Sequence, residues 1–413
     1  MKKNIVLLLS FTIAVLSVTP VQAQQSNETE LKAHVYYLAD DKLKGRLTGT
    51  KGAKLAAKYI RKTYKDIGLT SLIGKNYTQE FDYVYNSNPH GGQPIDKKSI
   101  SGKNIIGFLD NGADKTILIG AHYDHLGGNE HHNSTDPNSD GEIHNGADDN
   151  ASGVAVLLEL ARSLANNDKT EKANYIFACF SGEEDGLMGS KALAEYISKY
   201  IKLDLMINMD MLGRLNAERS IIVSGVGTSP RFTTIVKNNT PEDFKLTMDS
   251  SGVGPTDHTS FYLKNYPVLS FFTGSHSDYH KPTDDADKLN YAGMVDIHRY
   301  IYSILEDLEN EASYPFEKTK VKSTKEVPKY KVTLGVMPDY ADYGDGLHLD
   351  AVTEGRPADL AGLMQGDIVM KIGDCEITEV YSYMGCLAGH KTGDTVTITY
   401  KRGNQVKTTS LTF

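Results

Sequence analysis

Histidine and carboxylate side chains recur in this chain where short apolar runs end or a helix begins. The run KTILIGA is followed by His122 and the run LMINM by Asp210, and a pair of glutamates follows NYIFACF after two residues. The residues with this placement are His122, Asp148, Asp149, Glu183, Glu184, Asp210 and His280. A single one would usually be a helix cap or a hydrogen-bonded core residue, but their recurrence at five places indicates one shared site. Imidazole with carboxylate suits zinc better than magnesium or calcium, which favour all-oxygen sites.

The number of candidate ligands predicts two metal ions. Two histidines and three carboxylates are more than one tetrahedral zinc with a water can use, whereas two zinc ions that share a bridging carboxylate would use them all. The adjacent Glu183 and Glu184 fit this arrangement, because successive side chains on extended backbone diverge. One of the two can bind metal while the other faces the attacking water as general base.

The elements that would position these residues alternate between apolar strands and amphipathic helices. The predicted strands are 104–109, 115–121, 174–180, 204–209, 220–225 and 266–274, and the predicted helices include 31–38, 54–68, 151–165, 190–200 and 294–311. This alternation predicts a three-layer α/β/α domain with a mostly parallel sheet covered on both faces. Ligands of open α/β sheets bind outside the carboxyl ends of the strands, which is where the candidate residues fall.

The N-terminal segment predicts export. Lys2 and Lys3, an apolar stretch and the small-residue site VQA ending at Ala23 are typical of a cleaved signal peptide over residues 1–23. No cysteine lies near that site, so we expect no lipid anchor, and no later segment is apolar enough to span a membrane. The mature protein is therefore expected in the periplasm or the medium. Loss of the two lysines takes the net charge from −9 to −11, which argues against a nucleic-acid partner.

A change of composition near residue 316 divides the mature chain. We expect a first domain over 24–315, a lysine-rich linker over 316–330 and a compact β-rich domain over 331–413. Three cysteines do not make a disulfide framework. Cys179 lies inside an apolar strand and is expected to be inert core, whereas Cys375 and Cys386 could either pair or remain free in an oxidising compartment.

Five motifs resemble those of the co-catalytic dizinc exopeptidases, which include secreted bacterial leucyl aminopeptidases, glutamate carboxypeptidase II and glutaminyl cyclases. They are HYDH, GADDNASG, SGEEDGLMGS, NMDM and YHKPTDD, in this order, within a resemblance that covers roughly 31–310. The resemblance implies that His122 and Asp210 bind one zinc, that Glu184 and His280 bind the other, and that Asp149 bridges the two, with Asp148 as runner-up. It also implies that Glu183 is the general base and that Asp124 orients His122. Tyr279 would either donate a hydrogen bond to the oxyanion or pack, and Asp257 and His258 would support the site.

The C-terminal domain resembles PDZ domains of periplasmic serine proteases. The resemblance rests on PADLAGLMQGDIVMKIGD and KTGDTVTITYKRG, while YGDGLHL (343–349) only loosely matches the glycine-hydrophobic loop of that family. A groove for a peptide or a protein C-terminus and a purely structural module therefore both remain open.

The resemblance favours a secreted zinc aminopeptidase that acts on peptides with a free N-terminus. A glutaminyl cyclase is the first alternative, although this chain has no tryptophan and places Tyr279 where those enzymes have one. A glutamate carboxypeptidase would need more arginines than the few near the motifs, such as Arg214. A non-catalytic protein that binds peptides through its PDZ domain is the alternative from another class.

Two further groups of residues have open roles. The polar loop 126–145 contains His131, His132 and His144, which we expect to be solvated rather than to bind stray metal. Phe261, Tyr262 and Met211 could line a substrate pocket or belong to the core.

Overall fold

The computed structural model describes residues 28–86, 97–131, 133–136, 138–319, 332–338, 345–352, 355–378 and 380–413. The predicted signal peptide and most of the predicted linker lie outside the described residues. Among the helices that the structure describes, none is long and apolar enough to cross a membrane.

The described residues up to 319 build one mixed sheet of nine strands. The strands are β1 (Thr70–Ser71), β2 (Thr78–Asn86), β3 (Lys97–Leu109), β4 (Lys115–His122), β5 (Ala173–Phe180), β6 (Leu205–Met209), β7 (Ser220–Ser224), β8 (Lys245–Met248) and β9 (Val268–Phe272). Their order is β1-β3-β5-β4-β6-β9-β7-β8, with β2 paired to β3. The neighbours β5, β4, β6 and β9 run parallel, so their carboxyl ends meet at one edge.

The expectation of a mostly parallel sheet is correct for these central strands, and β8 also runs parallel to β7, but the other pairs are antiparallel. Strand β3 runs antiparallel to β5, β2 runs antiparallel to β3, and β7 runs antiparallel to β9. The chain between β3 and β4 explains the first reversal, because only residues 110–114 connect them. A parallel neighbour would need a crossover of roughly a dozen residues or more.

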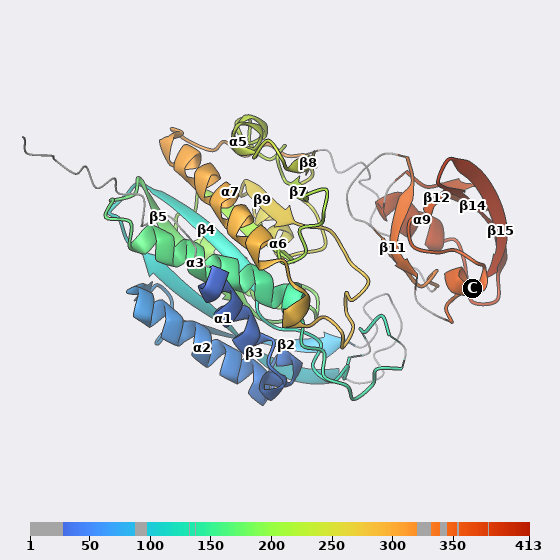
Figure 1. Ribbon diagram of the computed structural model, residues 1–413, viewed down its shortest axis with the longest axis horizontal. Coiled ribbons are helices and arrows are strands. Elements are labelled where there is room, and N and C mark those ends of the chain that lie inside the picture. The colour runs from blue at the N-terminus through green and yellow to red at the C-terminus, as the bar shows by residue number, and fades with distance from the viewer. Residues whose placement is uncertain are drawn as a thin grey trace, which may run out of the picture.

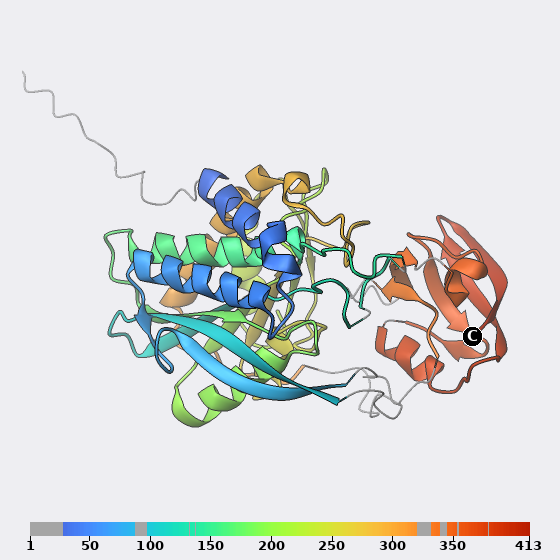
Figure 2. The ribbon, with the colours of Figure 1, turned by 90° about the horizontal axis from the view of Figure 1, so that it is seen from below.

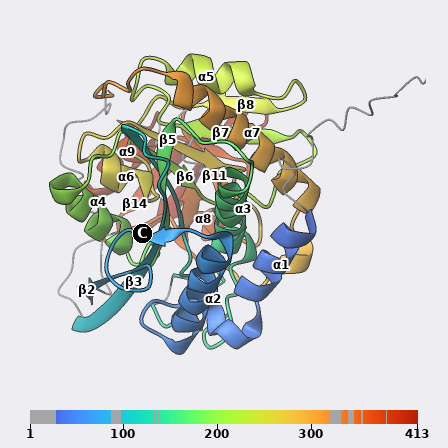
Figure 3. The ribbon, with the colours of Figure 1, turned by 90° about the vertical axis from the view of Figure 1, so that its left-hand side faces the viewer.

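Helices cover both faces of the sheet and make the expected three layers. They are α1 (Glu28–Leu38), α2 (Lys51–Ile67), α3 (Gly153–Ala165), α4 (Met188–Tyr200), α5 (Phe232–Asn239), α6 (His258–Tyr262) and α7 (Tyr291–Asn310), with short turns η1 (Asp41–Arg46), η2 (Ala147–Ser152) and η3 (Ala286–Lys288). Helices α1, α2, α3 and α7 lie on one face and α4 and α6 on the other (Figures 1 and 3). All residues of β5 are buried, as expected for a strand covered on both sides.

The sequence at the ends of α2 explains where this helix begins and ends. The Thr50 side chain accepts a hydrogen bond from the Ala53 N–H, and the helix stops at Gly68, whose φ of 95° favours glycine. Below α2, the long paired strands β2 and β3 sweep along one edge of the domain (Figure 2).

Arg46, at the end of η1, connects the loops that follow β4 and precede η2. Its guanidinium is 1% exposed and donates to the carbonyl oxygens of Leu38 (2.6 Å), Tyr123 (2.7 Å), Asn145 (2.6 Å) and Gly146 (2.9 Å). Burial lowers the pKa of Arg46 to about 10, against the opposing charges of nearby carboxylates, so the side chain stays charged at neutral pH. One cation therefore satisfies four buried carbonyls on three separate segments.

The C-terminal domain has its own sheet and its own core. Its elements are β10 (Val336–Pro338), β11 (Leu347–Val352), α8 (Pro357–Leu360), β12 (Ile368–Ile372), β13 (Cys375–Glu376), α9 (Val380–Leu387), β14 (Thr395–Arg402) and β15 (Gln405–Thr412). The strands that the structure describes there follow the order β10-β11-β12-β14-β15, with β13 paired to β12. Buried apolar residues such as Leu347, Val369 and Ile398 form the core.

The cysteines take both of the expected forms. Cys375 and Cys386 form a disulfide that ties β13 to α9, which settles the question that the sequence left open. Cys179 is free and buried, as predicted, and burial raises the pKa of its thiol to about 12.

The first domain extends further than the predicted boundary at residue 315. The Glu317 N–H donates to the Thr228 carbonyl, the Thr319 N–H donates to the Tyr262 hydroxyl, and Phe316 packs against the core on the α4 face. Residues 316–319, expected to begin the linker, are therefore anchored to the first domain.

Replacing Arg46 with methionine should lower the free energy of unfolding of the first domain by roughly 3–5 kcal/mol, because several buried carbonyls would lose their donor. Urea denaturation followed by circular dichroism measures this. Arg61→Met is the matched control, because Arg61 makes one side-chain hydrogen bond, to Thr78 (3.3 Å), and should cost about 1 kcal/mol or less. Equal losses in the two variants would contradict the connecting role of Arg46.

Replacing both Cys375 and Cys386 with serine should destabilise the C-terminal domain by roughly 3 kcal/mol, because the disulfide closes a loop of sequence separation 11. Thermal unfolding of the full chain should show this loss in the transition of the C-terminal domain alone, since the two domains have separate cores. Cys179→Ala, a control in the first domain, should leave that transition in place. An unchanged transition in the double variant would show that the disulfide is not a stabilising element.

Candidate metal centre

The parallel strands deliver the predicted ligands to one edge of the sheet. His122 is the last residue of β4, Asp210 directly follows β6, and Glu184 lies shortly after β5. Asp149 lies in η2, and His280 lies on the loop that follows β9. All five side chains come together, as the strand-end pattern predicted.

The five side chains form two groups that share Asp149. In the first group, His122 Nε2 lies 3.2 Å from Asp149 Oδ1 and 3.3 Å from Asp210 Oδ1. In the second group, His280 Nε2 lies 3.1 Å from Asp149 Oδ2 and 3.1 Å from Glu184 Oε2. The two oxygens of Asp149 thus face different histidines.

This geometry fits a pair of zinc ions. Ligands bound tetrahedrally to zinc at 2.0–2.1 Å lie about 3.3 Å from one another, close to the separations within each group. The electrostatics agree with the presence of cations. Burial opposes protonation of His122 and His280, but the surrounding carboxylates, Asp210 for the first and Glu184 for the second, raise the pKa of both imidazoles well above its ordinary value. The site therefore attracts positive charge.

Asp148, the alternative bridging residue, faces away from these groups. Its Oδ1 accepts hydrogen bonds from the Gly213 N–H (2.6 Å) and the Ser152 hydroxyl (3.0 Å), and its Oδ2 lies 3.2 Å from His276 Nε2. Asp284 holds the backbone of η2, because its Oδ2 accepts hydrogen bonds from the N–H groups of both Asp148 (2.9 Å) and Asp149 (3.1 Å). These contacts leave the Asp149 carboxylate as the one that faces both histidines.

Glu183 lies beside the first group. One ligand atom each of His122, Glu183 and Glu184 lie within 4.8 Å of one another. Burial raises the pKa of Glu183 well above its ordinary value. His122 opposes this shift, whereas the neighbouring carboxylates, among them Asp257, add to it. Glu184 behaves in the opposite way, because His280 and the hydrogen bond from His125 outweigh burial and lower its pKa to about 2. The environment therefore raises the pKa of one glutamate and lowers the pKa of the adjacent one.

Asp124 contacts different atoms from those expected. Its carboxylate lies 3.8 Å from His122 Nδ1, whereas its backbone carbonyl is closer, at 3.3 Å. The carboxylate oxygens accept hydrogen bonds from the Glu183 N–H (3.2 Å) and from the Thr48 hydroxyl (3.2 Å). Asp124 therefore holds the backbone of Glu183 as well as facing His122.

Asp257 and His258 are both buried at the start of α6, where they were expected to support the site. Burial raises the pKa of Asp257 to about 7, while His122 opposes this shift. Tyr279 stacks on the His280 imidazole, with ring centroids 3.9 Å apart. Its ring therefore packs against the second group.

The loop 126–145 is only in part the solvated segment that the sequence predicted: Glu130, Asp140 and Glu142 are exposed, but His131 and His144 are not. His144 is fully buried, with its Nε2 2.9 Å from the Ser134 hydroxyl. His131 stacks on Tyr85 and its Nδ1 lies 2.7 Å from Asp185 Oδ1, while His132 lies outside the described residues.

The loop also orients His280. The Asn133 carbonyl lies 3.1 Å from His280 Nδ1, and the His280 carbonyl accepts from the Ser134 hydroxyl (2.8 Å) and the Thr135 N–H (3.0 Å). A donor bond from Nδ1 leaves Nε2 free to face a metal ion, which is the usual arrangement of metal-binding histidines.

His125 is a site residue that the strand-end pattern missed. It is 0% exposed, and its Nδ1 lies 2.7 Å from Glu184 Oε1 and 3.8 Å from Asp149 Oδ2. The sequence signal was its position in HYDH, three residues after His122. Alternation along a strand would have placed it on the opposite side, but β4 ends at His122, so the alternation does not extend to His125.

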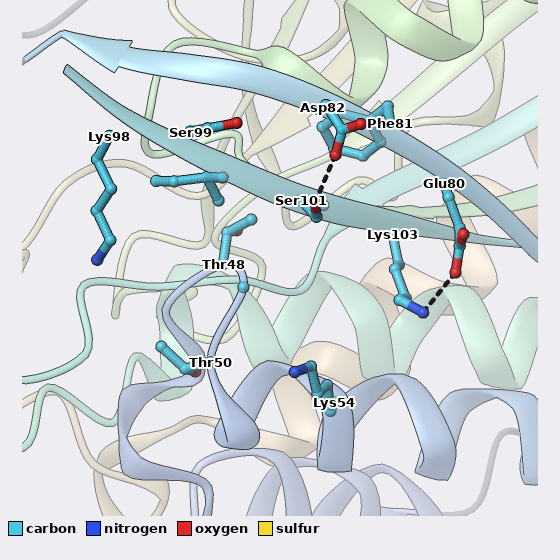
Figure 4. A pocket seen from close by; sticks show the side chains of 13 residues that line it. Thr48, Thr50, Lys54, Glu80, Phe81, Asp82, Lys98, Ser99, Ser101 and Lys103 are labelled. Carbon is cyan, nitrogen blue, oxygen red and sulfur yellow. Dashed lines mark hydrogen bonds and ion pairs between the residues drawn. The ribbon is translucent and has the colours of Figure 1, made fainter.

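A cavity of about 680 Å³ lies beside the centre, between the loop that enters α2 and the strands β2 and β3 (Figure 4). Its lining includes Lys54, Lys98 and Lys103, of which Lys103 is paired with Glu80. Thr48 connects the cavity to the centre through its hydrogen bond to Asp124. No predicted ligand lines the cavity, so it adjoins the metal centre without containing it.

The residues considered for a substrate pocket belong to the interior. Phe261 is fully buried, and Tyr262 and Met211 are 4% and 3% exposed. The core alternative is therefore correct for Phe261 and Tyr262, which α6 packs against the sheet, and Met211 is likewise buried on the loop after β6.

Comparisons with known proteins agree with this architecture. Residues 104–305 match the family described as peptidase family M28, and residues 331–413 match the PDZ domain. The alkaline phosphatase isozyme conversion protein of Escherichia coli (strain K12) is 30% identical over 225 residues, which are 54% of this chain and 61% of that protein. A probable leucine aminopeptidase of Arthroderma benhamiae is 29% identical over 201 residues, covering 46% of this chain and 54% of that protein. The matched region thus spans less than two thirds of either relative.

Solved structures share the fold of the first domain. An aminopeptidase from Aneurinibacillus sp. strain AM-1 aligns with a TM-score of 0.53 at 16% identity, over 73% of this chain and 98% of that chain. A glutaminyl cyclase from Bacteroides thetaiotaomicron aligns with a TM-score of 0.54 at 18% identity, over 70% and 99%. At these identities the likeness establishes the fold. Through residues 104–305 the chain belongs to peptidase family M28, the zinc aminopeptidase-like peptidases, and it carries a PDZ domain at residues 331–413.

Proposed function

We propose that this protein is an exported, zinc-dependent aminopeptidase that removes N-terminal residues from peptides. The observation that carries the proposal is the pair of ligand groups that share Asp149, with Glu183 beside them. The relative named as a probable leucine aminopeptidase supports the same activity.

Two zinc ions are proposed as cofactors. His122 and Asp210 would hold one, Glu184 and His280 the other, and Asp149 both. When bound, the pair supplies Lewis-acid activation of water and of the scissile carbonyl. The proposed domain that holds them begins at residue 24 and, with the anchored residues 316–319, extends past the boundary predicted at 315.

Glu183 is the proposed general base. It would accept the proton of the attacking water and return that proton to the leaving amine. Burial raises its pKa above that of an ordinary glutamate, which helps it to hold the proton that it must return to the leaving amine. Tyr279 is proposed to donate a hydrogen bond to the developing oxyanion while its ring holds His280 in place.

A glutaminyl cyclase is the alternative, because solved cyclases share the fold. The chain has no tryptophan and places Tyr279 directly before His280, which favours the peptidase. We also propose that a cleaved signal peptide directs export to the periplasm or the medium. The PDZ domain is proposed to capture a peptide or a protein C-terminus.

The proposal predicts the products that the purified mature protein should form from a peptide panel. Free peptides should lose N-terminal residues, N-acetylated peptides should stay intact, and a chelator should abolish cleavage. Mass spectrometry of the products measures this. Loss of ammonia from glutamine-initiated peptides alone would identify a cyclase instead, and C-terminal trimming would contradict an aminopeptidase.

Replacing Glu183 with glutamine should lower kcat by roughly 10²–10⁴-fold without removing zinc, because the change deletes a proton acceptor and leaves the ligand groups in place. Steady-state kinetics and metal analysis of the same preparation measure the two effects. Glu195→Gln, an exposed carboxylate on α4, is the control and should match the unmodified protein. Activity retained in Glu183→Gln would exclude this residue as the base.

A further inference from the structure

His125 has contacts that the five proposed ligands do not explain. It is a completely buried imidazole that lies on no strand or helix, and it comes directly after Asp124. A buried imidazole without polar contacts would be costly, so its neighbours show what it does.

The Nδ1 atom of His125 makes a short contact with one oxygen of Glu184. This contact, with Oε1, is 2.7 Å long, while the other oxygen, Oε2, lies 3.1 Å from His280 Nε2. The two oxygens of Glu184 therefore have separate partners. An ionised carboxylate can only accept hydrogen bonds, so the proton of this contact belongs to His125 Nδ1.

The second ring nitrogen of His125 makes no hydrogen bond to the ligand groups. Its Nε2 is buried and has no hydrogen-bond partner among the described residues. The edge of the ring lies against Gly146, where an added Cβ would come within 2.5 Å of the imidazole. Packing against this glycine, whose carbonyl also accepts from Arg46 (2.9 Å), fixes the ring plane.

His125 is better placed to hold Glu184 than to bind metal itself. Its Nδ1 lies 3.8 Å from Asp149 Oδ2, whereas His280 Nε2 lies 3.1 Å from that same oxygen. A contact of 2.7 Å to Glu184 is a normal charge-assisted hydrogen bond, but it is shorter than the separation of about 3.3 Å expected between two ligands of one tetrahedral zinc.

We propose that His125 is a positioning residue that donates from Nδ1 to Glu184 Oε1 and so directs Oε2 toward the metal ion shared with His280. The inference rests on the proposed metal centre. Partners of this kind typically change metal affinity by about 10–100-fold. The effect should be confined to the zinc held by Glu184 and His280, because the polar contacts of His125 are with Glu184 (2.7 Å) and Asp149 (3.8 Å) and not with His122 or Asp210.

The test measures zinc binding directly, so it does not depend on the identity of the substrate. The full mature chain, stripped of metal, is titrated with zinc in competition with a chromophoric chelator, and bound zinc is counted by elemental analysis. His125→Ala should raise one of two dissociation constants by about 10–100-fold and leave the other within about threefold. His125→Asn, whose amide can donate from nearly the same position as Nδ1, should restore most of the lost affinity.

His298→Ala is the matched control, because this histidine is equally buried and hydrogen-bonded to Ser163 (3.2 Å) on helices remote from the site. It should leave both constants unchanged, which separates positioning from a general loss of core packing. Equal weakening in His125→Ala and His125→Asn would overturn the proposal and make His125 a direct ligand. Unchanged zinc binding in His125→Ala would also overturn it.

A protein that binds fewer than two zinc ions without any substitution would refute the metal centre and this inference together. Two tightly bound zinc ions without peptide cleavage would refute the proposed activity and leave the role of His125 intact. The two failures are therefore distinguishable.

Discussion

The central constraint on this structure is the electrostatic repulsion among carboxylates gathered at one sheet edge. Asp149, Glu183, Glu184 and Asp210 meet there, and Asp124 and Asp257 are buried nearby. Buried like charges raise one another's pKa and cost free energy unless cations or hydrogen bonds compensate. The imidazoles of His122 and His280 compensate in part, and the proposed zinc pair would complete the compensation.

The protein meets this constraint by fixing the backbone of the loops that carry the ligands, and not only the ligand side chains. Arg46 joins the segment after β4 to the segment before η2, and Asp284 accepts from the backbone of Asp149. The loop 126–145 orients His280 through the Asn133 carbonyl. Each contact is made to a backbone or to a ring nitrogen that faces away from the ligand groups, so the ligand atoms remain directed at one another. The strands provide the edge, and these polar contacts position the side chains on it.

The sequence predicted those features that depend on local pattern. Apolar runs marked the central strands, and polar residues at their ends marked the edge, because parallel strands place their carboxyl ends together. The same reasoning failed where the outcome depended on distant contacts. The antiparallel pairing of β3 with β5 follows from the short connection between β3 and β4. Part of the polar loop is buried because His144 contacts Ser134 and the Asn133 carbonyl contacts His280. His125 escaped prediction because it lies three residues beyond the end of β4, where the alternation of strand side chains no longer applies. The role of Arg46 needed partners up to a hundred positions away, which no local pattern reveals.

Anomalous diffraction at the zinc edge, on crystals of the mature chain grown with zinc, would locate the metal ions of the proposed centre. Two peaks about 3.5–4 Å apart are expected, one between His122 and Asp210 and one between Glu184 and His280, with Asp149 bound to both. A single peak, or two peaks that do not share Asp149, would contradict the proposed centre.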